Sequence, residues 1–166
     1  QMLPRSCCDG NGDGIGDHWG VYSRLDYIKS LGVDAIWFSP LYPSPNFDYG
    51  YDVADYRSIN PEYGDLEIFK KVLDGAHERG MRVIMDLVVN HTSTEHEWFT
   101  SGRDKSDPHH DYYFWRPPRR GHNGARKEPN NWDSFFGGSA WEFDEQLGEY
   151  YLHVFARQQA DLNHDN

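Results

Sequence analysis

The sequence predicts an α/β protein in which strands and helices alternate along a parallel sheet. Residues 34–39 are expected to form a short strand, and residues 82–89 form a longer, nearly continuous apolar run, as expected for a parallel strand covered on both faces. Residues 24–31 and 65–76 have the spacing of helices with one apolar face. With a first strand ending near Pro4, the order is β, α, β, α, β, which implies right-handed crossovers.

The ends of the two helices carry their own signals. Apolar side chains recur every third residue within 24–31, and Gly32 follows as a C-terminal cap. Asp65 is placed to cap the second helix, and Gly80 ends it before the long apolar run. These caps fix where each helix begins and stops.

Polar residues close the longer apolar run. Asp86, Asn90 and His91 supply a carboxylate, an amide and an imidazole at the C-terminal end of the predicted strand. Polar side chains at that end of a barrel strand are typical of an active site. The alternative is that Asp86 is a satisfied core carboxylate and His91 a capping side chain.

Oxygen-bearing side chains alternate with glycine in DGNGDGIGD, residues 9–17. Ligands at every second position can converge on one hard cation, while the glycines permit sharp curvature. Calcium fits best and Mg²⁺ is a plausible substitute; an EF-hand is excluded because its acidic twelfth position is Gly20. The alternative is an exposed acidic turn without metal. The expected ligands are Asp9, Asn11, Asp13, the carbonyl of Ile15, and Asp17.

Several further segments occur together and in a characteristic order. They are PRS (4–6), DGNGDGIGD (9–17), GVDAIWFSPLYPSP (32–45), DYGYDVADY (48–56), DLVVNH (86–91), PNNW (129–132), FGGSAWE (136–142) and QQADLN (158–163). Together they resemble the α-amylase clan of glycoside hydrolases, in its α-glucosidase and oligo-1,6-glucosidase branch. The resemblance covers essentially the whole chain.

The resemblance implies a partial (β/α)8 TIM barrel, comprising the first three strands and two helices, with a small β-containing subdomain inserted after the third strand. Residues 1–91 would belong to the barrel, and residues 92–166 to the subdomain and the start of the return. Residues 141–144 and 150–155 look like the two strands of a hairpin there. A complete barrel takes about 250 residues, so this chain of 166 is expected to be an N-terminal part that pairs with the remainder of its polypeptide.

The resemblance also implies roles for individual residues. Asp48 and His91 would hydrogen-bond the glucose preceding the scissile bond, and Tyr51 would stack on its ring. Asp86 would orient an arginine near the nucleophile, and Gln159 matches a glutamine associated with short α-1,6 and α-1,4 oligosaccharides. Asn90 supports the same site. By resemblance, the catalytic nucleophile and acid/base follow later strands, so no catalytic residue is expected in this chain, and alone it should be inactive.

The function implied is that of a retaining α-glucosidase that hydrolyses terminal α-linked glucose from short oligosaccharides or disaccharides. A glucosyl-transferring or isomerising enzyme on the same scaffold, such as a sucrose isomerase or a trehalose synthase, is the alternative. A non-catalytic calcium-binding module is a more distant one, and the strand and helix alternation speaks against it.

Charge and cysteine content limit the partners. A net charge of −11 and a pI near 5.1 argue against nucleic acid, and no membrane segment is visible. The basic residues within 116–127 are expected to lie in a solvated loop.

Cys7 and Cys8 are adjacent, which disfavours a disulfide because their side chains are expected to diverge. Two free thiols suggest a reducing, cytoplasmic compartment.

Overall fold

The computed structural model describes residues 1–121 and 124–166, which form two compact units. The first unit contains Gln1–Pro43 and Asp55–Leu87, and the second contains Ser44–Ala54 and Val88–Asn166. The expected boundary after residue 91 differs from this division. The second unit gains its N-terminal segment through backbone contacts, among them the Ser93 amide donating to the Val53 carbonyl at 2.8 Å.

Parallel strands form the centre of the first unit. Strand β1 (Ala35–Phe38) pairs with β2 (Arg82–Met85) in parallel, Ala35 opposite Arg82. Met2 adds a single parallel bridge to Phe38, so the expected first strand is reduced to one residue. The described residues contain mixed helices and strands and no closed barrel.

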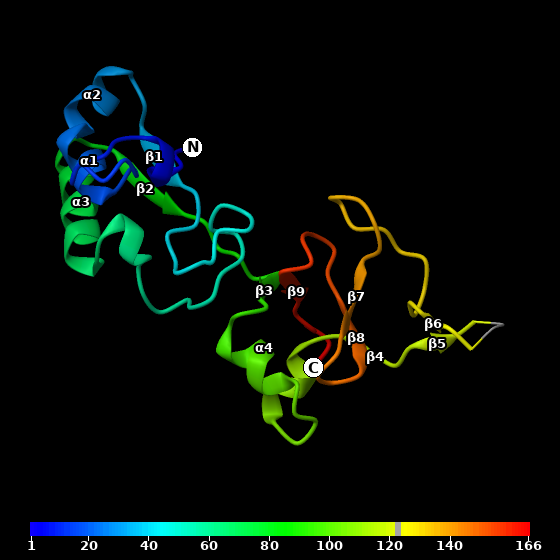
Figure 1. Cartoon of the computed structure of the whole chain (residues 1–166). Helices are drawn as coiled ribbons and strands as arrows, with labels where there is room; N and C mark the ends of the chain where they lie inside the picture. The colour runs from blue at the N-terminus through cyan, green and yellow to red at the C-terminus, as the bar shows by residue number, and fades with distance from the viewer. Residues whose placement is uncertain (122–123) are drawn as a thin grey trace. The chain divides into compact units, whose positions relative to one another are not determined.

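Three helices gather beside the β1–β2 pair (Figure 1). They are α1 (His18–Ser23), α2 (Leu25–Ser30) and α3 (Leu66–Glu78), with 3-10 turns at Pro4–Ser6 and Pro61–Tyr63. The caps agree with the sequence, since the Asp65 side chain accepts from the Ile68 amide and Gly32 and Gly80 have positive φ. Helix α1 was not expected. Its N-cap is Asp17, whose carboxylate accepts from the Gly20 amide at 2.7 Å.

The core of the first unit lies between α1, α2, α3 and the strand pair. It includes Val21, Leu25, Phe38 and Val72, each no more than 1% exposed. His18 is buried with them, against aromatic rings. Burial lowers the pKa of His18 to about 4, so its ring is neutral at pH 7.

Strand β2 is shorter and more exposed than the sequence indicated. It ends at Met85 rather than at Val89, and Ile84 and Leu87 are 51% and 72% exposed. Among the described residues, β2 is therefore not covered on both faces. No second layer among the described residues covers this side of the strand, which leaves large apolar side chains in solvent.

The described residues of the second unit form three small sheets, a short helix and a 3-10 turn. Its elements are β3 (His91–Ser93), α4 (Glu97–Gly102), η3 (Pro108–Tyr112), β4 (Trp115–Arg116), β5 (Arg119–Arg120), β6 (Arg126–Lys127), β7 (Trp141–Asp144), β8 (Glu149–Leu152) and β9 (Gln159–Asp161). Strands β3 and β9 pair antiparallel, and β4, β8 and β7 form a sheet in that order. The expected hairpin is confirmed as β7–β8, with Gly148 at φ 79° in its turn.

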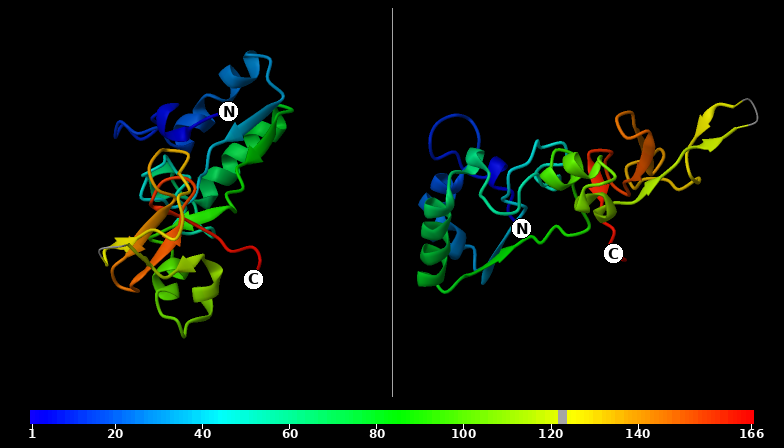
Figure 2. Two further views of the ribbon diagram at one scale, coloured as in Figure 1. Left: turned by 90° about the vertical axis from the view of Figure 1, so that its right-hand side faces the viewer. Right: turned by 90° about the horizontal axis from the view of Figure 1, so that it is seen from below.

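Strands β5 and β6 form an arm that projects from the β4–β8–β7 sheet (Figures 1 and 2). The basic residues expected in a solvated loop are exposed, but four of them, Arg119, Arg120, Arg126 and Lys127, form this short antiparallel ladder, and Arg116 lies in β4. Arg126 lies over the Phe143 ring, 3.6 Å from its centroid, and bonds Glu145 at 3.2 Å. A cation over an aromatic face and a carboxylate at its edge tie the base of the arm to the hairpin.

Aromatic side chains fill the core of the second unit. Phe99 is fully buried and packs against Tyr113, Trp115 and Tyr151 at ring separations of 5.0–5.3 Å. These rings are core, as expected from the general tendency of aromatics to pack. None of the helices in the described part of the chain has the length and apolar character needed to cross a membrane.

Candidate functional site

Three of the expected site residues meet in the second unit. The Gln159 side-chain nitrogen donates to Asp48 Oδ2 at 2.9 Å and lies 3.0 Å from His91 Nε2. These residues come from three separate sequence segments, and we call them the polar cluster. Gln159 is fully buried, and its Oε1 accepts from the Ala156 amide at 2.8 Å. Because that contact fixes which end of the amide is oxygen, the nitrogen must face Asp48.

His91 is held as a neutral ring. Its Nδ1 lies 3.2 Å from the Asn90 amide nitrogen, which can only donate, and its Nε2 lies 3.0 Å from the Tyr51 carbonyl, which can only accept. The Asn90 donor makes Nδ1 the acceptor, which leaves the proton on Nε2, where it is donated to the Tyr51 carbonyl; the Gln159 amide nitrogen, also 3.0 Å from Nε2, is then in contact with that nitrogen without a hydrogen bond to it. Burial lowers the pKa of His91 below its ordinary value, which agrees with a neutral imidazole.

Asp48 is the half-buried carboxylate of the polar cluster. The pKa of Asp48 is raised above its ordinary value, mainly because the carboxylate is desolvated. The charge of Asp52 raises the pKa further, and the Gln159 hydrogen bond lowers it in part. Its Oδ2 is bound by Gln159. Within the described residues Oδ1 of Asp48 accepts no hydrogen bond, so this oxygen is available to a ligand hydroxyl.

A buried aspartate shapes the loop that carries Asp48. Asp52 is fully buried, and its two oxygens accept from the backbone amides of Phe47 at 3.0 Å and of Asp48 at 2.9 Å. Tyr49, at φ 47°, gives the loop its sharp reversal. Asp52 was not expected to belong to the site. Its place directly after Tyr51 in DYGYDVADY was the available signal.

Tyr51 contributes its backbone to the structure around the polar cluster. Its carbonyl faces His91, and its amide donates to the Asp48 carbonyl at 3.0 Å. The side chain is half-buried. Its expected stacking on a sugar ring stays a prediction.

Asn90 links His91 to a second buried carboxylate. Its side-chain nitrogen donates to Asp161 Oδ1 at 3.2 Å, and Asp161 stands opposite His91 in the β3–β9 ladder. Burial raises the pKa of Asp161 to about 6. The Val154 amide also donates to it, at 3.3 Å. Asp161 therefore belongs to the framework behind His91, which was not expected from its sequence position.

Asp86 belongs to the first unit, directly after β2, and is half-buried. Its expected role in orienting an arginine stays a prediction. The expected contribution of the C-terminal end of this strand to the active site also stays a prediction.

The acidic loop of residues 9–17 is also in the first unit. Asp9 accepts from the amides of Gly12 at 2.6 Å and Gly14 at 2.8 Å, and these donors lower its pKa. Asn11 and Asp13 hydrogen-bond each other. Exposed oxygens on alternate residues of a curved loop fit a hard cation.

Asp17 fits that cation less well than the other expected ligands. It is 1% exposed and accepts from the amides of Gly10, Asn11 and Gly20. As the side chains stand, no group of three His, Cys, Asp or Glu residues in the described ranges converges on a metal position. The calcium site thus stays a prediction, which rests on the donor set of the loop.

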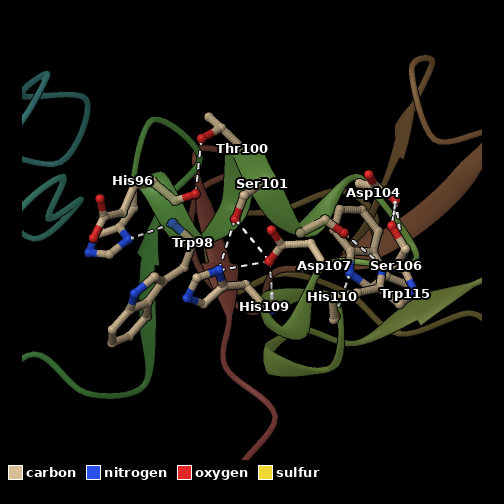
Figure 3. Close-up of polar contacts among 12 residues, drawn as sticks. His96, Trp98, Thr100, Ser101, Asp104, Ser106, Asp107, His109, His110 and Trp115 are labelled. Carbon is tan, nitrogen blue, oxygen red and sulfur yellow. Dashed lines mark hydrogen bonds and ion pairs between the residues drawn. The ribbon is translucent and has the colours of Figure 1, made fainter.

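A serine, a histidine and an aspartate also meet beside α4 (Figure 3). His109 Nδ1 lies 3.0 Å from Ser101 Oγ and 2.8 Å from Asp107 Oδ1. A nucleophile relay needs the serine and the carboxylate on opposite ring nitrogens. Because one nitrogen contacts both here, the trio joins α4 to the η3 turn and activates no nucleophile.

The model of the α-amylase catalytic domain matches residues 1–166. The chain belongs to the α-amylase family.

Two curated relatives indicate the branch of the α-amylase family. The oligo-1,6-glucosidase of Parageobacillus thermoglucosidasius is 57% identical and the α-glucosidase of Candida albicans 53% identical, each over 100% of this chain. The chain spans 29% of the length of each relative. The resemblance drawn from the sequence is therefore confirmed at the level of the family and its glucosidase relatives.

Solved structures of the α-amylase family match the fold closely. The trehalulose synthase MutB is 54% identical with a TM-score of 0.93, and the trehalose-6-phosphate hydrolase of Bacillus licheniformis is 50% identical with a TM-score of 0.93. Each match covers 100% of this chain and 29% of the solved chain. The α/β arrangement found here is thus that of the corresponding part of such enzymes.

Proposed function

We propose that this chain contributes the substrate-binding side of a retaining α-glucosidase that removes terminal α-linked glucose from short oligosaccharides. The observation that carries the proposal is the state of Asp48. One carboxylate oxygen is fixed by Gln159 at 2.9 Å, and the other accepts no hydrogen bond within the described part of the chain. A neutral His91 stands beside the same amide.

This arrangement suits a glucose ring. A carboxylate with one committed oxygen presents the other to a hydroxyl in a fixed direction, so little ordering is needed when the sugar binds. The negative charge also favours the oxocarbenium-like transition state of glycoside hydrolysis, in which positive charge develops on the ring. Tyr51 is proposed to supply the aromatic face.

We assign neither catalytic carboxylate to residues 1–166. Asp144 is buried and bonds Arg103 at 2.7 Å, and Asp161 is held by Asn90 and Val154. Carboxylates engaged in this way support the fold. The nucleophile and the acid/base are proposed to come from the remainder of the polypeptide, and Met2, β1 and β2 to be the first three strands of its (β/α)8 barrel.

Calcium is proposed as a structural ion in the acidic loop, with Mg²⁺ as a substitute. Asp9, Asn11 and Asp13 offer exposed oxygens, and Ile15 adds a backbone carbonyl. The loop immediately precedes α1, so a bound ion would stabilise the start of that helix. Asp17 would contribute only after turning from the amides it now accepts.

The experiment that tests the activity uses the whole protein that contains this chain. It is incubated with nitrophenyl α-glucoside, maltose and isomaltose, and the anomeric configuration of the first product is followed by NMR. We expect glucose released with the α-configuration, since retention requires two displacements. Release of β-glucose, or no cleavage of any of these three substrates, would refute the proposal.

A second candidate function is transfer or isomerisation of the glucosyl group. The observation that favours it is the match to a trehalulose synthase at 54% identity and a TM-score of 0.93. Sucrose distinguishes the two functions. A hydrolase yields free glucose and fructose in equal amounts, whereas an isomerase yields a new disaccharide and little free sugar.

A further inference from the structure

The chain contains two cysteines, and they are neighbours. Cys7 and Cys8 follow the 3-10 turn Pro4–Ser6, and both are free thiols. Their Sγ atoms lie 2.9 Å apart. The expectation that these side chains diverge is therefore wrong, because the backbone after the turn directs both sulfurs to the same side.

Backbone contacts hold this pair in place. The Cys7 amide donates to the Pro4 carbonyl at 3.0 Å, and the Cys8 carbonyl accepts from the Asp17 amide at 2.9 Å. Gly20 lies against Cys8 so closely that a Cβ at Gly20 would stand 1.9 Å from the Cys8 carbonyl oxygen. The two thiols are consequently presented by a braced segment rather than by a free loop.

The pair opens onto an apolar pocket. Both cysteines line a cavity of about 370 Å³, together with Met2, Tyr27 and Leu31. Cys7 is exposed and Cys8 partly exposed, so the sulfurs are reachable from solvent. A ligand that binds both sulfurs would place an attached organic group against apolar side chains.

We propose that Cys7 and Cys8 form a chelating dithiol site for trivalent organoarsenicals, with arsenic bridging the two sulfurs and its organic group in the adjoining pocket. Soft sulfur ligands select soft, thiophilic centres. Zinc is a poorer match, because a structural zinc site needs four ligands. Within the ranges described no third His, Cys, Asp or Glu joins the pair.

The reaction balances without a redox partner. With phenylarsine oxide, two S–H bonds and the As–O bonding are lost, two As–S bonds form, and the oxygen leaves with both protons as water. Arsenic stays trivalent and each sulfur stays at the thiol oxidation level. After the first As–S bond has formed, the second sulfur attacks within the same molecule at a high effective concentration.

The test uses the reduced protein, phenylarsine oxide and intact-mass spectrometry. We expect one phenylarsenic group per chain with loss of two hydrogens, retained against an excess of monothiol and released by 1,2-ethanedithiol. The Cys7→Ser and Cys8→Ser variants should each lose the phenylarsenic adduct when monothiol is added in excess. Retention by either single variant equal to that of the wild type, or no adduct on the reduced wild type, would overturn the proposal.

Two controls separate the chelate from the pocket and from misfolding. Cys7 is exposed, so Cys7→Ser should keep the circular dichroism spectrum and carries the test alone if Cys8→Ser does not fold. Leu31 is 60% exposed, and Leu31→Ser should weaken phenylarsine oxide binding several-fold while leaving arsenite binding unchanged. If Leu31→Ser weakened the binding of phenylarsine oxide and of arsenite equally, the placement of the organic group in the pocket would be contradicted.

Discussion

Among single residues, Asp48 and His91 are expected to affect turnover most. In the whole protein, Asp48→Asn and His91→Ala should each lower kcat and kcat/KM together by about 2–4 kcal/mol, the usual size for a contact that strengthens in the transition state. Steady-state kinetics on nitrophenyl α-glucoside measures both constants. Wild-type kcat with a raised KM would assign these residues to ground-state binding alone.

The matched control for that experiment is Asp74→Asn. Asp74 is an exposed carboxylate on α3 in the first unit. Removing its charge leaves the polar cluster untouched, so both kinetic constants should stay at the wild-type values. A parallel loss in this variant would trace the effect to net charge rather than to the site.

His18 is a residue whose replacement should stabilise the protein. It is fully buried, and neither ring nitrogen has a hydrogen-bond partner among the described residues. His18→Leu removes two unsatisfied polar atoms, each of which costs about 1–3 kcal/mol when buried. The melting temperature at pH 7 should therefore rise. His77→Leu, at an exposed position of α3, should leave it nearly unchanged.

Among the elements, the β3–β9 ladder contains a carboxylate that destabilises the folded state at neutral pH. Burial raises the pKa of Asp161 from 3.8 to about 6, so the folded state binds more protons than the unfolded state between these values. The free energy of unfolding therefore falls as the pH rises from about 4 through 6. Above pH 6 Asp161 is ionised in the folded state, and the full destabilisation is present. A shift of about two pKa units corresponds to roughly 3 kcal/mol.

Asp161→Asn should flatten that pH dependence. Urea unfolding at pH 4.5 and pH 7 gives the free energies, and the difference between wild type and variant isolates this residue. The gain at pH 7 should be smaller than the full cost, since an amide offers one acceptor to the two donors Asn90 and Val154. Asp111→Asn, at an exposed site, is the control. An unchanged slope in Asp161→Asn would contradict the assignment.

The acidic loop before α1 is the element that metal removal should affect. If calcium binds the folded state alone, it adds RT ln(1 + [L]/Kd), about 2.7 kcal/mol at a hundredfold excess over Kd. EDTA should then lower the melting temperature of the whole protein and leave low-temperature activity intact. Asp13→Ala should remove the effect of calcium. A melting temperature indifferent to calcium would remove the site.

Local signals in the sequence were sufficient for most of the elements. Asp65, Gly32 and Gly80 act through contacts within one turn, so their caps could be predicted without tertiary information. The C-terminal end of β2 could not be predicted from such local signals. Its apolar run continues to Val89, but strand pairing stops at Met85 because pairing depends on a neighbour that the run itself does not specify.

The polar cluster was predicted in part, for a similar reason. Asp48, His91 and Gln159 were identified by resemblance, and the structure places them in contact. Asp52 was missed because its importance comes from the two amides it accepts, which only the folded loop brings to it. The convergence of Cys7 and Cys8 likewise depends on backbone angles that no residue pattern encodes.

For the molecule as a whole, we expect the 166-residue chain purified alone to hydrolyse no α-glucoside. Binding groups without a nucleophile and an acid/base offer no route over the barrier. The measurement is release of nitrophenol from nitrophenyl α-glucoside, with the whole protein as the positive control. Turnover by the purified chain that survives Asp48→Asn and exceeds buffer hydrolysis would place a catalytic pair within these residues.

The antiparallel pairing of β3 with β9 holds together the two ends of the segment that lies between these strands. His91 and Asp161 stand opposite each other, so the excursion between them leaves and rejoins the chain at one point. Insertions in such a loop cost little, because doubling a flexible loop adds only about 0.6 kcal/mol of closure entropy. The β5–β6 arm can therefore lengthen or shorten at little cost in stability while β3 and β9, which carry His91 and Gln159, stay in register.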